Sequence, residues 1–170
     1  AVAGAFLAVD LLFFSANGHG GWESVIANLV APGTRILVPG TGHFSDGWAE
    51  QVRAFGGEAV RTPYVEGTPI DAAAVEAALR ADTAHTIAAV FAVHTDTASG
   101  TTSDLRAIRR AIDAAAHPAL YVVDVVASLG AVPFGMDALG VNVVMGGSQK
   151  GLMLPPGLAF VAADARALEV

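Results

Sequence analysis

Residues 87–93 read IAAVFAV and are followed at once by the polar stretch HTDTASGT at 94–101. A run this apolar is typical of a parallel strand that is buried on both faces of a sheet. A second run, LYVVD at 120–124, has the same character and ends in an acid. Because amphipathic, alanine-rich stretches alternate with such runs, the sequence predicts repeated strand–helix units and hence an α/β protein.

Extended along the chain, the same pattern predicts about seven strands. They fall near Leu11–Ser15, Arg35–Pro39, Glu58–Thr62, Ile87–Val93, Leu120–Asp124, Val141–Met145 and Leu158–Ala162. The last strand follows a Pro-Pro-Gly turn, which permits an antiparallel direction. We therefore expect residues 1–170 to form a single three-layer α/β/α sandwich around a mostly parallel sheet.

Four helices are expected between these strands. One follows Gly21 and another runs from about Ser45 to Phe55. A third is expected to begin with Thr68 as its N-cap, followed by a proline and, three residues on, an acid. The fourth opens at Ser103 and Asp104, after which apolar residues share one face.

Composition narrows the classes of function. The net charge of −7 leaves no basic patch for nucleic acid, and polar residues interrupt the apolar N-terminal stretch before it could span a bilayer. Residues 1–9 lack a basic leader, so we expect no signal peptide. The chain has no cysteine, which excludes thiolate chemistry and fits a cytoplasmic protein. His43, His85 and His117 lack metal-ligand spacing, and we expect no metal site.

One basic residue differs from the rest. The chain has nine basic residues, of which Lys150 is the single lysine, and it lies in an uncharged, glycine-flanked stretch at 146–154. Arginine cannot lose its proton or form an imine, whereas a partly buried lysine can do both. Two plainer explanations are that Lys150 is a solvated residue in a surface loop, or that it remains by chance in a chain whose basic residues are mostly arginine.

Three further polar segments, like the one around Lys150, come directly after predicted strands, which places all four at one edge of the sheet. The glycine-rich loop 15–23 suits a phosphate at a helix N-terminus, or is simply a tight turn. The loop 93–101 suits a polar ring substituent, or consists of turn formers. Asp124 needs a cationic partner if buried, for which a protonated pyridine nitrogen, a magnesium ion or a helix cap would serve. Trp22 and Trp48 are interpreted as core residues.

Taken in order, these segments resemble the class V aminotransferases of fold type I, of the alanine–glyoxylate, serine–glyoxylate and serine–pyruvate kind. The resemblance runs from about Leu11 to Ala163. Its most specific part is DVVASLG at 124–130, followed by GSQKGL at 147–152 and PPG at 155–157. It implies an enzyme that uses pyridoxal 5′-phosphate to move an amino group from a serine- or alanine-type amino acid to a 2-oxo acid such as glyoxylate or pyruvate.

The resemblance also implies roles around the cofactor ring. Lys150 matches the Schiff-base lysine, which also moves the proton between substrate and cofactor. Asp124 matches the partner of the pyridine nitrogen. Phe44 lies where the family stacks an aromatic ring, Val126 packs on the opposite face, and Thr97 matches a hydroxyl near the ring oxygen.

The phosphate end and the domain organisation follow in the same way. Asn17, Gly18 and His19 resemble the phosphate-binding turn, to which Gln149 adds a side chain. Residues 96–100 read DTASG where the family often has an acid followed by two hydroxyl residues and glycine, which leaves the amino donor open.

The resemblance further implies a homodimer, with residues 1–170 as the cofactor-binding large domain. The family's N-terminal segment and C-terminal small domain, with its carboxylate-binding arginine, are expected to be absent from this stretch. Three alternatives stay open: a non-catalytic fragment or binding module, a lyase on the same scaffold, and an unrelated nucleotide binder.

Overall fold

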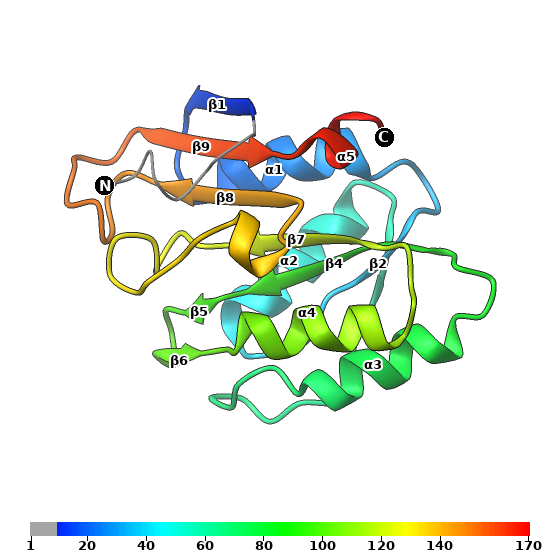
Figure 1. The fold of residues 1–170 in the computed structure, drawn as a ribbon. Coiled ribbons are helices and arrows are strands. Elements are labelled where there is room, and N and C mark those ends of the chain that lie inside the picture. The colour runs from blue at the N-terminus through cyan, green and yellow to red at the C-terminus, as the bar shows by residue number, and fades with distance from the viewer. Residues whose placement is uncertain (1–9) are drawn as a thin grey trace.

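The computed structural model describes residues 10–170, which form one sheet of seven strands with helices on both faces (Figure 1). The strands of this sheet are β1 (Asp10–Ser15), β2 (Arg35–Leu37), β3 (Glu58–Val60), β4 (Ile87–Val93), β7 (Leu120–Asp124), β8 (Val143–Gly147) and β9 (Leu158–Ala163). The helices are α1 (Gly18–Leu29), α2 (His43–Ala54), α3 (Ala72–Ala81), α4 (Leu105–Ala114), the short α5 (Ala165–Leu168) and the 3-10 turn η2 (Asp137–Leu139). The expected three-layer sandwich is confirmed.

The strand order is β1-β9-β8-β7-β4-β2-β3. Neighbouring pairs among β2, β3, β4, β7 and β8 are parallel, whereas β9 runs antiparallel to both β8 and β1. In register, Val93 lies opposite Asp124, and Asp124 opposite Met145. The carboxyl ends of β4 and β7 are therefore level, β8 continues past them to Gly147, and the loops that leave these strands meet at one edge of the sheet.

Alternate residues of each central strand enter two separate cores. In β4, Val90 and Ala92 pack with α3 and α4, while Phe91 and Val93 pack with α1 and α2. This period of two explains why the buried strands are apolar on both faces. The two helix pairs thus cover opposite faces of the sheet, as Figure 1 shows.

The structure corrects several element boundaries. Asp71, not Thr68, caps α3 by accepting a hydrogen bond from Ala73 N, because its side chain lies directly before the first helical turn. Helix α1 begins at Gly18 instead of after Gly21, and α2 begins at His43. The strand expected at Val141–Met145 is shifted to Val143–Gly147.

The short helix α5, the 3-10 turn η2 and a hairpin near the site were not expected from the sequence. The polar loop after β4 forms a small hairpin of β5 (Thr95–Asp96) and β6 (Thr101–Thr102). The hairpin holds the hydroxyl-rich residues of this loop at the edge of the sheet where the strands end.

Candidate active site

A cavity of about 200 Å³ lies at the carboxyl ends of the parallel strands. Its lining residues are Asn17, Gly18, His19, Trp22, Phe44, Thr95, Thr97, Asp124, Val126, Ala127, Gln149 and Lys150. All nine residues singled out from the sequence are in this set. The sequence therefore predicted correctly that the four segments meet, and it missed Trp22, Thr95 and Ala127.

Lys150 lies in the turn after β8 and lines the cavity. Its Nζ is 3.5 Å from the hydroxyl oxygen of Thr97 in the hairpin. A Cβ placed on Gly151 would be 2.4 Å from the backbone oxygen of Leu129, so only glycine permits this contact. Gly130 has a φ of +85° and approaches the same turn. The segments 124–130 and 147–152 are therefore packed together, and Lys150 lies where they meet.

Asp124 ends β7 and is almost fully buried. Its Oδ1 accepts a hydrogen bond of 2.6 Å from Val126 N, and its Oδ2 accepts one of 2.8 Å from the indole nitrogen of Trp22. Burial raises the pKa of Asp124 to about 6, and the charge of Asp96 adds to this. The two hydrogen bonds and Lys150 oppose the rise, so the carboxyl can ionise near neutral pH.

The start of α1 forms one end of the cavity. Asn17 caps the helix, and its Oδ1 accepts hydrogen bonds from His19 N at 3.1 Å and Gly20 N at 3.3 Å. A Cβ on Gly18 would lie 2.8 Å from a methyl group of Val126, so the helix end can approach the loop after β7 only with glycine there. A helix N-terminus of this kind attracts an anion.

Gln149 lies at the cavity, next to Lys150 in the chain. Among residues 10–170, the buried side-chain oxygen of Gln149 has no hydrogen-bond partner. A buried polar atom without a partner is costly, so an incoming ligand that offered a donor or, after an amide flip, an acceptor would satisfy it.

A hydrogen bond to Asp96 helps to hold Phe44 in position, in addition to the packing of its ring. Asp96 is fully buried, and its Oδ2 accepts hydrogen bonds from Phe44 N at 3.0 Å and from Thr41 Oγ1 at 3.2 Å. These bonds tie the start of α2 to the hairpin. The Phe44 ring meets Trp22 edge-on, with centroids 6.3 Å apart. Phe44 and Val126 are therefore the apolar walls available to a flat ring.

This arrangement of a lysine, a buried acid and a helix N-terminus around one cavity suits a ligand with an aldehyde, a basic ring nitrogen and a phosphate. The sequence model of the class-V aminotransferases matches residues 2–170. The chain therefore belongs to the class V aminotransferase family, whose members in general use pyridoxal phosphate.

Relatives and solved structures agree with that assignment. The chain is 45% identical over 162 residues to an L-aspartate–glyoxylate aminotransferase of Paracoccus denitrificans and 43% identical over 159 residues to a serine–glyoxylate aminotransferase of Methylorubrum extorquens; each match covers 94% of this chain and 40% of the relative. The structure superposes on an aspartate aminotransferase of Thermus thermophilus with a TM-score of 0.87 and 34% identity, covering 99% of this chain and 47% of that one. The chain thus spans less than half the length of these relatives.

Two further observations concern the described residues. Within residues 10–170, no helix is long and apolar enough to cross a membrane. In the same part of the chain, no group of three or more His, Asp or Glu side chains is arranged to hold a metal ion.

Proposed function

We propose that this protein is a pyridoxal-phosphate-dependent aminotransferase. The observation that carries the proposal is that Lys150, the single lysine, and the buried acid Asp124 line the same cavity. Since the chain spans 40% of the length of its curated relatives, the activity of the whole protein is part of the proposal.

The residues present fit the cofactor at each of its three functional groups. Lys150 Nζ would hold it covalently at its aldehyde carbon. Asp124 would pair with the ring nitrogen, which would give the buried carboxylate a cationic partner in direct contact. Thr97 would offer its hydroxyl to the ring oxygen, while Phe44 and Val126 would enclose the ring.

The phosphate would lie at the start of α1. The residues that would hold it are Asn17, Gly18, His19 and Gln149. The helix N-terminus supplies positive potential there, and the unsatisfied amide of Gln149 gains a partner. For the backbone N–H of His19 to reach the phosphate, Asn17 would have to release that N–H.

When bound, pyridoxal phosphate acts as an electron sink for negative charge that develops at the substrate Cα. Asp124, when ionised, would keep the ring nitrogen protonated and so support that role. The amino group of the substrate would replace Lys150 at the aldehyde carbon, which would free the Lys150 amine. That amine would then take the proton from Cα as a general base and return it to the cofactor side as a general acid.

The relatives narrow the substrates. The two curated relatives described above differ in their amino donor, aspartate in one and serine in the other, but both names specify glyoxylate. We therefore propose glyoxylate as the acceptor and a small amino acid of the serine or alanine type as the donor. An aspartate donor is the alternative that the Paracoccus relative supports.

The proposal extends to the setting of the enzyme. Residues 1–170 are proposed to be its cofactor-binding large domain, within a cytoplasmic homodimer. Sedimentation of the purified protein with and without pyridoxal phosphate measures the oligomeric state directly.

The test is an absorption spectrum of the purified protein with pyridoxal phosphate, before and after borohydride. We expect a visible band that borohydride converts to a stable adduct on the peptide containing Lys150. Lys150→Ala should abolish the adduct, and Lys150→Arg, which keeps the charge but cannot form an imine, should abolish it as well. An adduct that survives Lys150→Arg would refute the role of Lys150. Glyoxylate-dependent turnover of serine, alanine and aspartate then identifies the donor.

A further inference from the structure

A buried hydrogen bond joins α1 to the end of β7. The indole nitrogen of Trp22 donates to Asp124 Oδ2 over 2.8 Å, between residues 102 positions apart in the chain. The Trp22 side chain is only 3% exposed. Its ring stacks on Trp48, with centroids 5.4 Å apart and planes inclined by 11°, and Trp48 stacks in turn on Phe91. The donor is thus held in place by this aromatic packing.

The neighbouring tryptophan shows that a buried indole N–H is not always paired here. Within residues 10–170, the Trp48 indole nitrogen is buried and has no hydrogen-bond partner. The two indoles share one aromatic stack, and only that of Trp22 reaches an acid. The apolar packing of the stack is therefore separable from the hydrogen bond, which makes Trp48 a matched control for Trp22.

We propose that Trp22 is a positioning residue for Asp124, which holds the carboxylate in the orientation and charge state needed to pair with the ring nitrogen of the cofactor. This inference rests on the function proposed above. Val126 N binds Oδ1 and the Trp22 indole binds Oδ2, so both oxygens are fixed from the protein side. Each oxygen keeps one more acceptor site, which remains open to a ligand.

The hydrogen bond also acts on the charge of Asp124. A donor that bonds to the ionised form favours that form, so the Trp22 bond opposes the effect of burial, and the net pKa of Asp124 is about 6. The other charged or titratable groups around this pair are Asp96 from the hairpin and Lys150 from the turn after β8. His19 on α1 has its ring 4.8 Å from that of Trp22.

The first test needs no substitution in the pair. In cofactor-free protein, the two indole N–H resonances are followed by NMR as a function of pH. We expect the Trp22 resonance to move with a midpoint near 6, as Asp124 gains its proton, and the Trp48 resonance to stay constant. Asp124→Asn should abolish the movement. A Trp22 resonance that still moves in Asp124→Asn would show that Asp124 does not cause the effect and would overturn the proposal.

The second test separates the hydrogen bond from the packing. Trp22→Phe keeps a ring in the stack but removes the donor, and Trp48→Phe removes an indole N–H that has no hydrogen-bond partner in the described part of the chain. In Trp22→Phe, we expect the titration of Asp124, followed by its ¹³C carboxyl signal, to move up by about one pH unit. We also expect the dissociation constant of pyridoxal phosphate at pH 6 to rise about tenfold, with partial recovery at pH 8. Trp48→Phe should leave both unchanged.

The outcomes distinguish this inference from the proposed function. If Asp124 titrates alike in Trp22→Phe and Trp48→Phe, the positioning role is wrong, whether or not the cofactor binds. If the titration shifts but borohydride traps no adduct on Lys150 in the unaltered protein, the hydrogen bond acts as proposed and the cofactor assignment fails. Should Trp22→Phe not fold, the indole titration of the unaltered protein decides the question by itself.

Discussion

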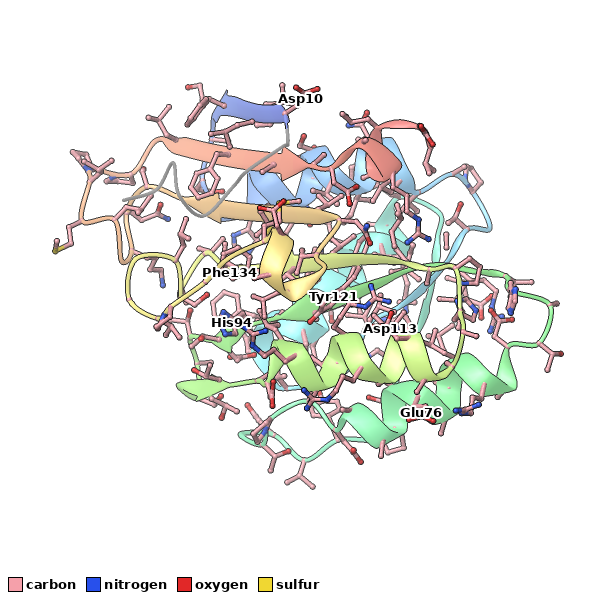
Figure 2. All side chains as sticks on the ribbon, viewed as in Figure 1. Asp10, Glu76, His94, Asp113, Tyr121 and Phe134 are labelled. Atoms are coloured by element: carbon pink, nitrogen blue, oxygen red, sulfur yellow. The ribbon has the colours of Figure 1, made fainter. Side chains whose placement is uncertain are left out.

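His94 Nδ1 lies 2.8 Å from the hydroxyl oxygen of Ser128, which joins the end of β4 to the loop that follows β7. Both residues are buried, and the His94 ring lies near Phe134, with centroids 6.3 Å apart (Figure 2). The backbone N–H of His94 also donates to Asp124 O. This residue therefore supports the segment that presents Asp124 and Val126 to the cavity.

Ser128→Ala should destabilise the protein by about 1–3 kcal/mol, because it leaves a buried imidazole nitrogen without its partner. The free energy of unfolding, measured in urea, checks this. Ser99→Ala is the matched control: Ser99 is exposed and its hydroxyl oxygen accepts a hydrogen bond from Thr101 N, so its loss should change stability by less than about 0.5 kcal/mol. Equal effects of the two substitutions would mean that the His94–Ser128 contact contributes nothing.

Asp124→Asn should change how stability depends on pH. Burial raises the pKa of Asp124 from 3.8 to about 6, so the folded protein binds this proton more tightly than the unfolded chain does. The stability gained from binding this proton is therefore fully present below pH 3.8, falls as the pH rises towards 6, and is absent above that. The loss amounts to about 3 kcal/mol.

Cofactor-free protein at pH 4 to 6.5 provides the measurement, in which wild type is compared with Asp124→Asn. The comparison is needed because burial lowers the pKa of His94, which has the opposite effect on stability. Stability is lost at Asp124 as the pH rises, whereas it is lost at His94 as the pH drops below 6.5. That contribution is common to both proteins and cancels in the difference. A difference that does not vary across this range would contradict the raised pKa of Asp124.

Gly18→Ala should weaken binding of pyridoxal phosphate at least about tenfold. The added methyl group would lie 2.8 Å from Val126, so either α1 or the loop after β7 has to move. Either movement disturbs the phosphate end or one wall of the cavity. Titration of the cofactor, monitored by absorbance, measures the effect.

Gly47→Ala is the control for that substitution, because it adds the same methyl group to a glycine away from the cavity lining. Gly47 lies inside α2, and a Cβ there would meet Trp22 at an ordinary 3.7 Å. Because glycine is a poor helix former, alanine should stabilise the protein by about 0.5–1 kcal/mol and leave cofactor affinity unchanged. Destabilisation by Gly47→Ala would show that the aromatic stack tolerates no added volume.

The sequence predicted the sheet and the gathering of the site because both depend on local patterns. Runs such as 87–93 reveal two-sided burial, and polar residues directly after parallel strands must meet at one edge. Helix starts were less accurate. Thr68 and Asp71 are both good capping residues within four positions, and the choice between them depends on where the chain enters the core.

Such sequence patterns could not predict the role proposed for Trp22. A tryptophan in an amphipathic helix is rightly predicted to be buried, and Trp22 is. Its hydrogen bond, however, depends on the packing of α1 against β8, beside the strand that carries Asp124. The hint in the sequence was its place in the same glycine-rich segment as Asn17.

The cavity draws on residues from Asn17 to Lys150, brought together by strands that are not in sequence order in the sheet. No shorter stretch of the chain contains the whole site, so a ligand that fills it binds only the assembled fold. Such a ligand raises the free energy of unfolding by mass action, by about 2.7 kcal/mol at a concentration one hundred times its dissociation constant. The melting temperature of the protein would thus become a readout of occupancy, and the supply of such a ligand would help to set how much of the protein is folded.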